Sequence, residues 1–303
     1  MEPARTPKPS WLKVRFPEGE RYRAVRDAVS CRGLHTVCRE ARCPNVAECW
    51  GSGTATFLIL GDVCTRGCRF CAVTRGDPAG ALPSDEPARV AAAARTMGLD
   101  YVVVTSVTRD DLPDGGAAVF AETVRAVQAL TPPPLVELLI PDLLGGALDT
   151  VVDAGPDVLA HNVEVVERLT PALRHGRFAY RRSLEVLEQA KARDPALVTK
   201  SSILLGLGEA EEEILTTMED LRRVGVSLLV LGQYLQPTRD HAPVHEYVPP
   251  ERFDALADTG RAMGFDFVAA GPLVRTSYRA AEAYVRSLRG GSGAANDTDP
   301  LAP

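Results

Sequence analysis

No apolar run in this 303-residue chain reaches the ~18–20 residues that a membrane-spanning helix needs, so a protein anchored by such a helix is excluded. The first residues also lack the apolar core of a secretory signal and the acid-free, amphipathic character of a transit peptide. Positive charge is not in excess, because the formal net charge is −6, and a broad surface for nucleic acid or another polyanion is therefore not expected. We expect a cytosolic (cytoplasmic) protein with neither a membrane nor a nucleic acid among its partners.

Cysteine is missing from most of the chain, because all seven cysteines lie between Cys31 and Cys71. A disulfide scaffold would spread its cysteines along the sequence and would need an oxidising compartment. An odd, clustered set in a cytosolic protein indicates metal or iron–sulfur ligation instead.

Short apolar runs alternate with helical segments over most of the chain, whose composition of 45% hydrophobic and 24% charged residues is that of an ordinary globular protein. Each run is rich in Val, Leu or Ile, which is typical of strands buried on both faces of a sheet. The expected strands cover residues 55–60, 101–107, 135–140, 157–160, 197–205 and 227–231. The expected helices cover residues 22–29, 85–97, 116–130, 179–192 and 209–224. This alternation predicts a parallel sheet with right-handed crossovers.

Polar residues that can carry chemistry follow the end of each expected strand. In a barrel all of these ends meet at one mouth, whereas in an open sheet only the ends near the switch point meet. Because six strand–helix units are fewer than the eight of a closed barrel, we predict an α/β fold, a partial, open (β/α)6 TIM-like barrel over residues 51–270. An N-terminal cysteine-rich extension (1–50), a C-terminal extension (271–289) and a disordered tail (290–303) are expected to flank it.

Cys64, Cys68 and Cys71 form a C-x3-C-x2-C loop directly after the first expected strand. Three thiolates can hold three irons of a [4Fe–4S] cluster and leave the fourth iron open, and an open position is typical of a catalytic metal site. S-adenosylmethionine (SAM) can chelate that iron and accept an electron, and its cleavage then gives a 5′-deoxyadenosyl radical. The loop therefore indicates radical chemistry, with a structural zinc site as the alternative.

Cys38, Cys43 and Cys49 form a second triplet, C-x4-C-x5-C, upstream of the expected barrel. It again offers three ligands, one short of a full set. Zinc knuckles usually pair their ligands as C-x2-C, a spacing that only Cys68 and Cys71 have. We favour a cluster over zinc at both triplets. The remaining cysteine, Cys31, is expected to pack as a small hydrophobic residue.

Six stretches of the sequence match a known pattern: His35–Cys38, Ala41–Asn45, Cys64–Cys71, Thr105–Leu112, Gly206–Glu209 and Gly232–Pro237. Through them the chain resembles the lipoyl synthase family of radical-SAM enzymes, from Trp11 to Ala280. The second cysteine triplet is the discriminating motif, because many unrelated reactions share the radical-SAM loop.

The resemblance implies two [4Fe–4S] clusters. Cys64, Cys68 and Cys71 would bind the catalytic, SAM-binding cluster, and the second triplet would bind an auxiliary cluster. In this family the fourth ligand of the auxiliary cluster is a serine of an Arg-Ser-Ser-Tyr motif, which reads Arg275-Thr276-Ser277-Tyr278 here. Since Thr276 replaces the first serine, Ser277 is the expected ligand; without the family context, a helix N-cap would be the simpler interpretation of Ser277.

The resemblance also implies the reaction. A radical derived from SAM removes hydrogen from C6 of an octanoyl chain on a carrier domain, and the carbon radical takes sulfur from the auxiliary cluster. A second SAM repeats the step at C8, and the cluster is consumed. The implied partners are octanoylated lipoyl domains (2-oxoacid dehydrogenase E2 subunits and the glycine cleavage H protein), an electron donor and an iron–sulfur cluster delivery protein.

Five residues near the expected mouth are candidate contacts for SAM: Phe70, Ser106, Glu137, Asn162 and Glu164. Ser106 could instead be an ordinary strand-end hydroxyl and Phe70 ordinary packing. The run from Arg109 to Asp111 could be a surface ion-pair network. His241, in a proline-flanked loop, is expected to be solvated.

Two other functions remain open from the residues themselves. One is a different sulfur-inserting radical-SAM enzyme that acts on a free small molecule. The other is a non-catalytic, zinc-binding interaction protein, which would give no reason for polar residues to gather at six strand ends.

Overall fold

The computed structural model describes residues 7–13, 19–51 and 55–276. Its main sheet has eight strands in the order β1-β2-β5-β6-β7-β8-β9-β10. They span His35–Thr36 (β1), Thr56–Ile59 (β2), Tyr101–Ser106 (β5), Leu135–Leu139 (β6), Val158–Ala160 (β7), Val198–Leu205 (β8), Leu228–Gln233 (β9) and Phe267–Gly271 (β10). All neighbours from β2 to β10 are parallel, whereas β1 is antiparallel to β2.

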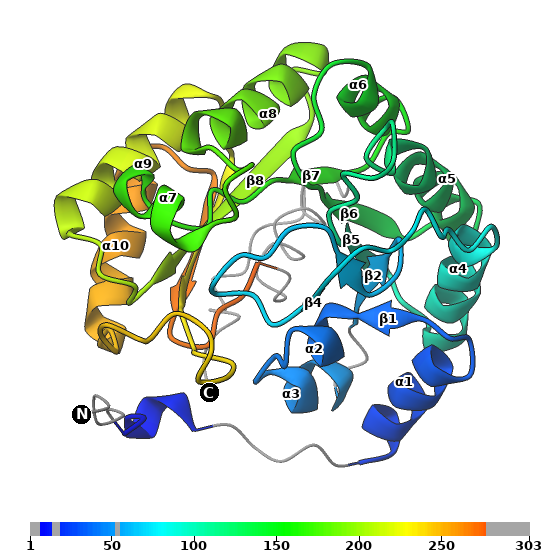
Figure 1. The fold of residues 1–303 in the computed structure, drawn as a ribbon, viewed down its shortest axis with the longest axis horizontal. Helices are drawn as coiled ribbons and strands as arrows, with labels where there is room; N and C mark the ends of the chain where they lie inside the picture. The colour runs from blue at the N-terminus through cyan, green and yellow to red at the C-terminus, as the bar shows by residue number, and fades with distance from the viewer. Residues whose placement is uncertain (1–6, 14–18, 52–54, 277–303) are drawn as a thin grey trace.

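The helices lie outside the curled sheet (Figure 1). Those that follow the barrel strands are α4 (Glu86–Met97), α5 (Ala117–Gln128), α6 (Gly146–Val152), α7 (Thr170–Leu173), α8 (Tyr180–Arg193), α9 (Glu211–Arg223) and α10 (Pro250–Ala262), with a 3-10 turn at Glu167–Leu169. The N-terminal part contributes a 3-10 turn at Ser10–Leu12 and the helices α1 (Glu20–Ser30), α2 (Val37–Glu40) and α3 (Val46–Gly51). No helix in the described ranges is long and apolar enough to cross a membrane.

The barrel core follows from the alternation of side chains along the strands. In β6, Val136 and Leu138 face outward and join the buried cluster under the outer helices. A second set of residues, at or near the starts of the strands, faces inward and closes the amino-terminal end of the barrel: Tyr101, Val103, Leu135, Val158 and Leu228. The carboxyl ends are thereby left for polar side chains.

The expected partial, open barrel is confirmed, and the six expected strands and five expected helices are present with ends shifted by at most two residues. The sheet has one more parallel strand than expected, β10, and the sequence analysis also missed α6 and α10. Two alanines and a glycine make β10 a weaker apolar run than the other strands. Within the described residues β10 does not pair back onto β1, so the sheet stays open between them.

The N-terminal segment lies on this open side. Helices α2 and α3 lie between the two edge strands β1 and β10 (Figure 1). The buried side chain of Asn45, just before α3, donates a hydrogen bond of 2.6 Å from Nδ2 to the carbonyl oxygen of Leu273, just after β10. The segment before α3 and the chain that follows β10 therefore meet across the opening of the barrel.

Candidate active site and cysteine centres

The first cysteine triplet lies in a tight loop after β2. Two short parallel strands, β3 (Val63–Cys64) and β4 (Thr74–Arg75), hold the start and end of this loop together. Gly67 lies at its turn against the exposed side chain of Arg75, which would have to move to accept a Cβ atom there, 2.6 Å away. The loop thus brings three cysteines of one eight-residue stretch to a single place.

The three thiols suit iron ligation. Cys64, Cys68 and Cys71 are free and partly buried, and all three line one cavity. The backbone N–H groups of Arg66 and Thr108 each lie 3.4 Å from the Cys64 sulfur, within hydrogen-bonding distance. Burial raises the pKa of the Cys71 thiol to about 12. Because the surroundings do not by themselves favour the thiolate, metal coordination would have to stabilise it.

Buried ion pairs anchor the loop to the next strand ends. Arg66 pairs with Asp110 at 2.8 Å and with Asp142 at 2.7 Å. Arg109 is 1% exposed, pairs with Asp111 at 2.7 Å and donates to the Leu60 carbonyl oxygen. The interpretation of the run from Arg109 to Asp111 as a surface ion-pair network therefore holds only in part. Asp110 and Asp111 are exposed, but the arginines that they pair with, Arg66 and Arg109, are buried, which costs solvation but fixes geometry.

The cavity beside the triplet has a volume of about 170 Å³ and lies at the carboxyl ends of β2, β5, β6 and β7. Four of the five expected SAM contacts line it: Phe70, Ser106, Asn162 and Glu164. Within the described part of the chain, the buried Oγ of Ser106 and Oδ1 of Asn162 have no hydrogen-bond partner. Unpartnered polar atoms in a cavity fit a polar ligand that would satisfy them, as SAM would.

Glu137 has a different place from the one expected. It is not among the residues that line the cavity, although it faces the barrel interior from β6. Its carboxylate is 1% exposed, pairs with Lys200 and accepts a hydrogen bond of 2.6 Å from the Tyr101 hydroxyl. Since both of its oxygens are bonded within the protein, we assign Glu137 a structural role and not a contact with SAM.

Glu164 adopts a backbone conformation that is rare for its residue type. Its φ is 67°, in the left-handed region, and the backbone is held there by hydrogen bonds with Ser202 and Leu204. Asn162 Nδ2 donates to its side chain at 3.1 Å. Burial raises the pKa of Glu164. Strain that the surrounding hydrogen bonds maintain is typical of functional sites.

The sequence analysis missed two residues of this cavity, Arg174 and Phe178. Both lie in the connection between α7 and α8, outside any motif. The Phe178 ring is packed between the guanidinium groups of Arg174, 4.1 Å from its centroid, and Arg66, at 4.2 Å. Burial lowers the pKa of Arg174, and the Glu164 carboxylate opposes that shift. Arg174 places a cation where a ligand carboxylate could bind.

Two further expectations from the sequence are wrong. Cys31 is exposed, not packed as a hydrophobic residue, and its sulfur lies 3.4 Å from Arg32 Nη1. The His241 ring is partly buried, and its Nε2 lies 2.9 Å from the carbonyl oxygen of Cys71. His241 therefore contacts the cysteine loop from a segment far away in the sequence.

The second triplet lies in the segment that covers the open side of the barrel. Cys38 is in α2, Cys49 is in α3 and Cys43 lies between them, with its N–H bonded to the Cys38 carbonyl oxygen at 3.2 Å. Burial raises the pKa of Cys38, and the indole N–H of Trp50 partly offsets the shift. The buried indole Nε1 is thus a hydrogen-bond donor beside the Cys38 sulfur.

A partly buried cation, Arg275, completes this region. Arg275 is close enough to Cys43 for each to shift the pKa of the other, although burial has the larger effect on both and lowers the pKa of Arg275. No carboxylate in the described part of the chain pairs with Arg275. A cation beside Cys43 and an N–H donor beside Cys38 fit the negative charge of a thiolate-ligated cluster. Ser277, the expected fourth ligand, lies outside the described residues.

The spacing of the sulfur atoms differs from that of a preformed zinc site. Ligands about 2.3 Å from one tetrahedral zinc ion lie about 3.8 Å from each other. Among the residues that the structure describes, only one group of three ligand side chains has its atoms within 4.8 Å of one another, and it contains no cysteine. In neither triplet do all three sulfur atoms lie within 4.8 Å of one another.

Two models of known protein families match separate parts of the chain. The family model of the Radical SAM superfamily matches residues 58–221, and that of the N-terminal domain of lipoyl synthase matches residues 2–43. The chain is 58% identical to "Lipoyl synthase" of Anaeromyxobacter dehalogenans, over 92% of this chain and 95% of that protein. It is 53% identical to "Lipoyl synthase" of Thermus thermophilus, over 95% and 90% of the two chains.

Solved structures with low sequence identity share the fold alone. The crystal structure of Streptococcus suis SuiB bound to precursor peptide SuiA superposes with a TM-score of 0.57 at 12% identity, over 71% of this chain. This chain spans about half of that protein, 48% of its length. Methylornithine synthase (PylB) superposes with a TM-score of 0.53 at 14% identity, over 82% of this chain and 69% of that one.

Proposed function

The chain belongs to the lipoyl synthase family of radical-SAM enzymes, and we propose that its two cysteine triplets divide the work of that reaction. It is a sulfurtransferase that inserts two sulfur atoms, at C6 and C8, into an octanoyl chain on a lipoyl carrier protein. Its cofactors are SAM and [4Fe–4S] clusters. When bound, they supply the radical and the sulfur, which no protein side chain could provide at an unactivated C–H bond.

Cys64, Cys68 and Cys71 are proposed to hold the SAM-binding cluster. The observation that carries this assignment is that all three line the cavity at the strand ends, together with unpartnered Ser106 and Asn162 atoms. Three protein ligands leave one iron position open for SAM. Arg174 would bind the carboxylate of SAM, and Asn162 and Ser106 would meet its other polar groups. Phe70 and Glu164 would complete the wall of the site.

Cys38, Cys43, Cys49 and Ser277 are proposed to hold the auxiliary cluster, the sulfur donor. Support comes from the contact between Asn45 and Leu273, which brings the second triplet to the chain that leads to Ser277. Arg275 beside Cys43 supplies the matching positive charge. A serine alkoxide is a weaker match for iron than a thiolate, and it would be the ligand that is lost when the cluster is opened.

The finer properties of the enzyme are also proposals. The carrier proteins would be E2 subunits of 2-oxoacid dehydrogenases and the H protein of glycine cleavage. An electron donor would reduce the first cluster, and a delivery protein would rebuild the second. The three working parts would be residues 1–50, 51–270 and 271–289, in a cytoplasmic protein.

Two cysteine substitutions test the division of roles. With an octanoylated carrier, SAM and a reductant under anaerobic conditions, Cys68→Ser should abolish both 5′-deoxyadenosine and lipoyl formation. Cys43→Ser should abolish lipoyl formation while 5′-deoxyadenosine is still produced. Cys31→Ser, which changes the exposed cysteine that belongs to neither triplet, serves as the control and should behave as the unmodified enzyme. Production of 5′-deoxyadenosine by Cys68→Ser would overturn the assignment.

The alternative functions lose support. A sulfur-inserting enzyme for free small molecules and a zinc-binding interaction protein are both less consistent with the curated relatives, which are lipoyl synthases over nearly their whole length.

A further inference from the structure

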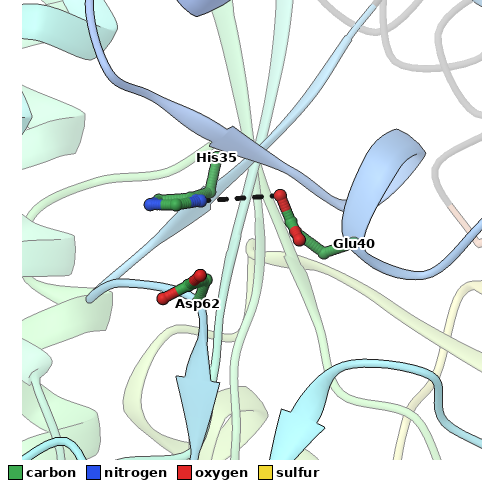
Figure 2. A group of neighbouring side chains, drawn as sticks. All are labelled: His35, Glu40 and Asp62. Atoms are coloured by element: carbon green, nitrogen blue, oxygen red, sulfur yellow. Dashed lines mark ion pairs between the residues drawn. The ribbon is translucent and has the colours of Figure 1, made fainter.

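We propose that His35, Glu40 and Asp62 form a binding site for a divalent cation of the first transition row, such as Mn²⁺ or Fe²⁺. One ligand atom from each side chain lies within 4.8 Å of the other two. Figure 2 shows the three side chains pointing toward a common space from three separate segments. The proposed role of this site rests on the function proposed above, although cation binding itself does not.

The fold brings Asp62 to His35 and Glu40, which are more than twenty residues before it in the sequence. Antiparallel pairing of β1 with β2 sets His35 opposite Leu58. Helix α2 ends at Glu40, whose side chain points back toward His35 on β1. Asp62 lies in the turn between β2 and β3. The sequence analysis named His35 only as part of a matching stretch and gave none of the three residues a ligand role, because the pairing of β1 with β2 is what brings Asp62 to the other two.

The charges of the group are unbalanced. His35 Nδ1 lies 3.5 Å from Glu40 Oε1, beyond ordinary hydrogen-bond length. In the described part of the chain no arginine or lysine pairs with Glu40 or Asp62. A third carboxylate, the buried Glu86, lies within electrostatic range of Arg89 and of His35 and accepts the Leu60 N–H at 2.7 Å. The neighbouring Glu40 and Asp62 carboxylates repel each other, and a divalent ion would remove that repulsion.

The ligand chemistry selects the kind of ion. One imidazole nitrogen with two carboxylate oxygens suits manganese, iron or zinc better than calcium or magnesium, which prefer oxygen alone. The His35 and Glu40 side chains are 34% and 30% exposed, so an ion could reach them and keep water as further ligands. We expect a single, exchangeable site.

The position of the site suggests its use. Glu40 is two residues after Cys38, and Asp62 is two residues before Cys64. An ion shared by these side chains would tie the segment of the proposed auxiliary cluster to the loop of the proposed SAM-binding cluster. It would act as a clamp that maintains the relative placement of the two centres.

Mn²⁺ binding to the full chain with its clusters reconstituted tests the proposal. The electron paramagnetic resonance signal of free Mn²⁺ reports the bound fraction. We expect one Mn²⁺ per chain, with binding at least tenfold weaker in Asp62→Asn and in Glu40→Gln. Asp254→Asn, an exposed carboxylate on α10, removes the same charge elsewhere and should bind as the unmodified chain does.

Two results would overturn the site. One is the absence of bound Mn²⁺ at roughly millimolar concentration, which is the weak end of the affinity range of protein sites for divalent cations. The other is equal Mn²⁺ binding by all three variants. Iron content and 5′-deoxyadenosine formation in the same samples report separately on the clusters. A chain that forms both products and binds no Mn²⁺ would refute the cation site and leave the proposed function intact.

Discussion

Lys200 Nζ donates a hydrogen bond of 2.7 Å to the carbonyl oxygen of Thr276, the residue that precedes Ser277 in the sequence. Lys200 is 1% exposed and also pairs with Glu137. The Thr276 hydroxyl donates to Ser202 Oγ at 2.9 Å and accepts from Asn162 Nδ2 at 3.1 Å. The barrel interior thus holds the chain directly before the proposed auxiliary-cluster ligand, and Asn162 links it to the cavity.

Lys200→Met should destabilise the protein by about 3–5 kcal/mol, because it leaves the Glu137 carboxylate buried and unpaired. Adding Glu137→Gln removes that charge and should restore much of the stability. Lipoyl formation should stay low in the double variant, since the Thr276 carbonyl still lacks its donor. Urea unfolding and product yield measure the two effects separately. Recovery of both together would show that Lys200 contributes only stability.

Ser277→Ala should make one of the two clusters labile. Reconstituted enzyme should hold about eight irons and eight sulfides, as two four-iron clusters require. The variant should fall toward about four of each while it still cleaves SAM. Thr276→Ser keeps a hydroxyl for Ser202 and Asn162 and is the matched control. Unchanged iron content and activity in Ser277→Ala would remove Ser277 from the site.

Arg174→Gln should weaken SAM binding by about tenfold or more, because a hydrogen bond to a charged group contributes about 1.5–3 kcal/mol. Equilibrium binding of SAM to the cluster-loaded enzyme measures the effect. Arg177→Gln changes a nearby arginine whose side chain is 65% exposed, and it should bind SAM normally. Equal affinities in the two variants would place the SAM carboxylate elsewhere.

His161 should make the protein less stable in acid. Burial lowers its pKa from 6.5 to about 4, although Asp142 opposes the shift. Between these pH values the unfolded chain binds the proton and the folded chain does not. Above pH 6.5 His161 therefore costs the folded protein no stability. As the pH falls from 6.5 toward 4, the free energy of unfolding declines by roughly 3 kcal/mol in all.

Urea unfolding of wild type and His161→Gln at pH 5 and pH 7 checks this contribution. The variant should lose less stability than wild type on acidification, because glutamine has no proton to gain. Parallel losses in the two proteins would mean that other groups govern the acid response.

The sequence determined the features that depend on neighbours along the chain. Continuous apolar runs produced the parallel strands, since burial on both faces leaves no polar positions within them. The C-x3-C-x2-C spacing brings Cys64, Cys68 and Cys71 together within one loop, whatever surrounds it. Their gathering at the cavity with Ser106 and Asn162 was predictable because parallel strands in a barrel share one mouth.

Tertiary structure alone decided which side chains meet across elements. The sequence could place Glu137 on β6, but only the packed barrel shows that Lys200 and Tyr101 occupy its carboxylate. Arg174 lines the cavity although the loop between α7 and α8 that carries it contains no motif. His35 and Asp62 became neighbours through the pairing of β1 with β2. Periodicity tells which way a side chain faces. Which partner a side chain meets, how deeply it is buried and which charges surround it depend on chain segments far away in the sequence, and no local pattern records these.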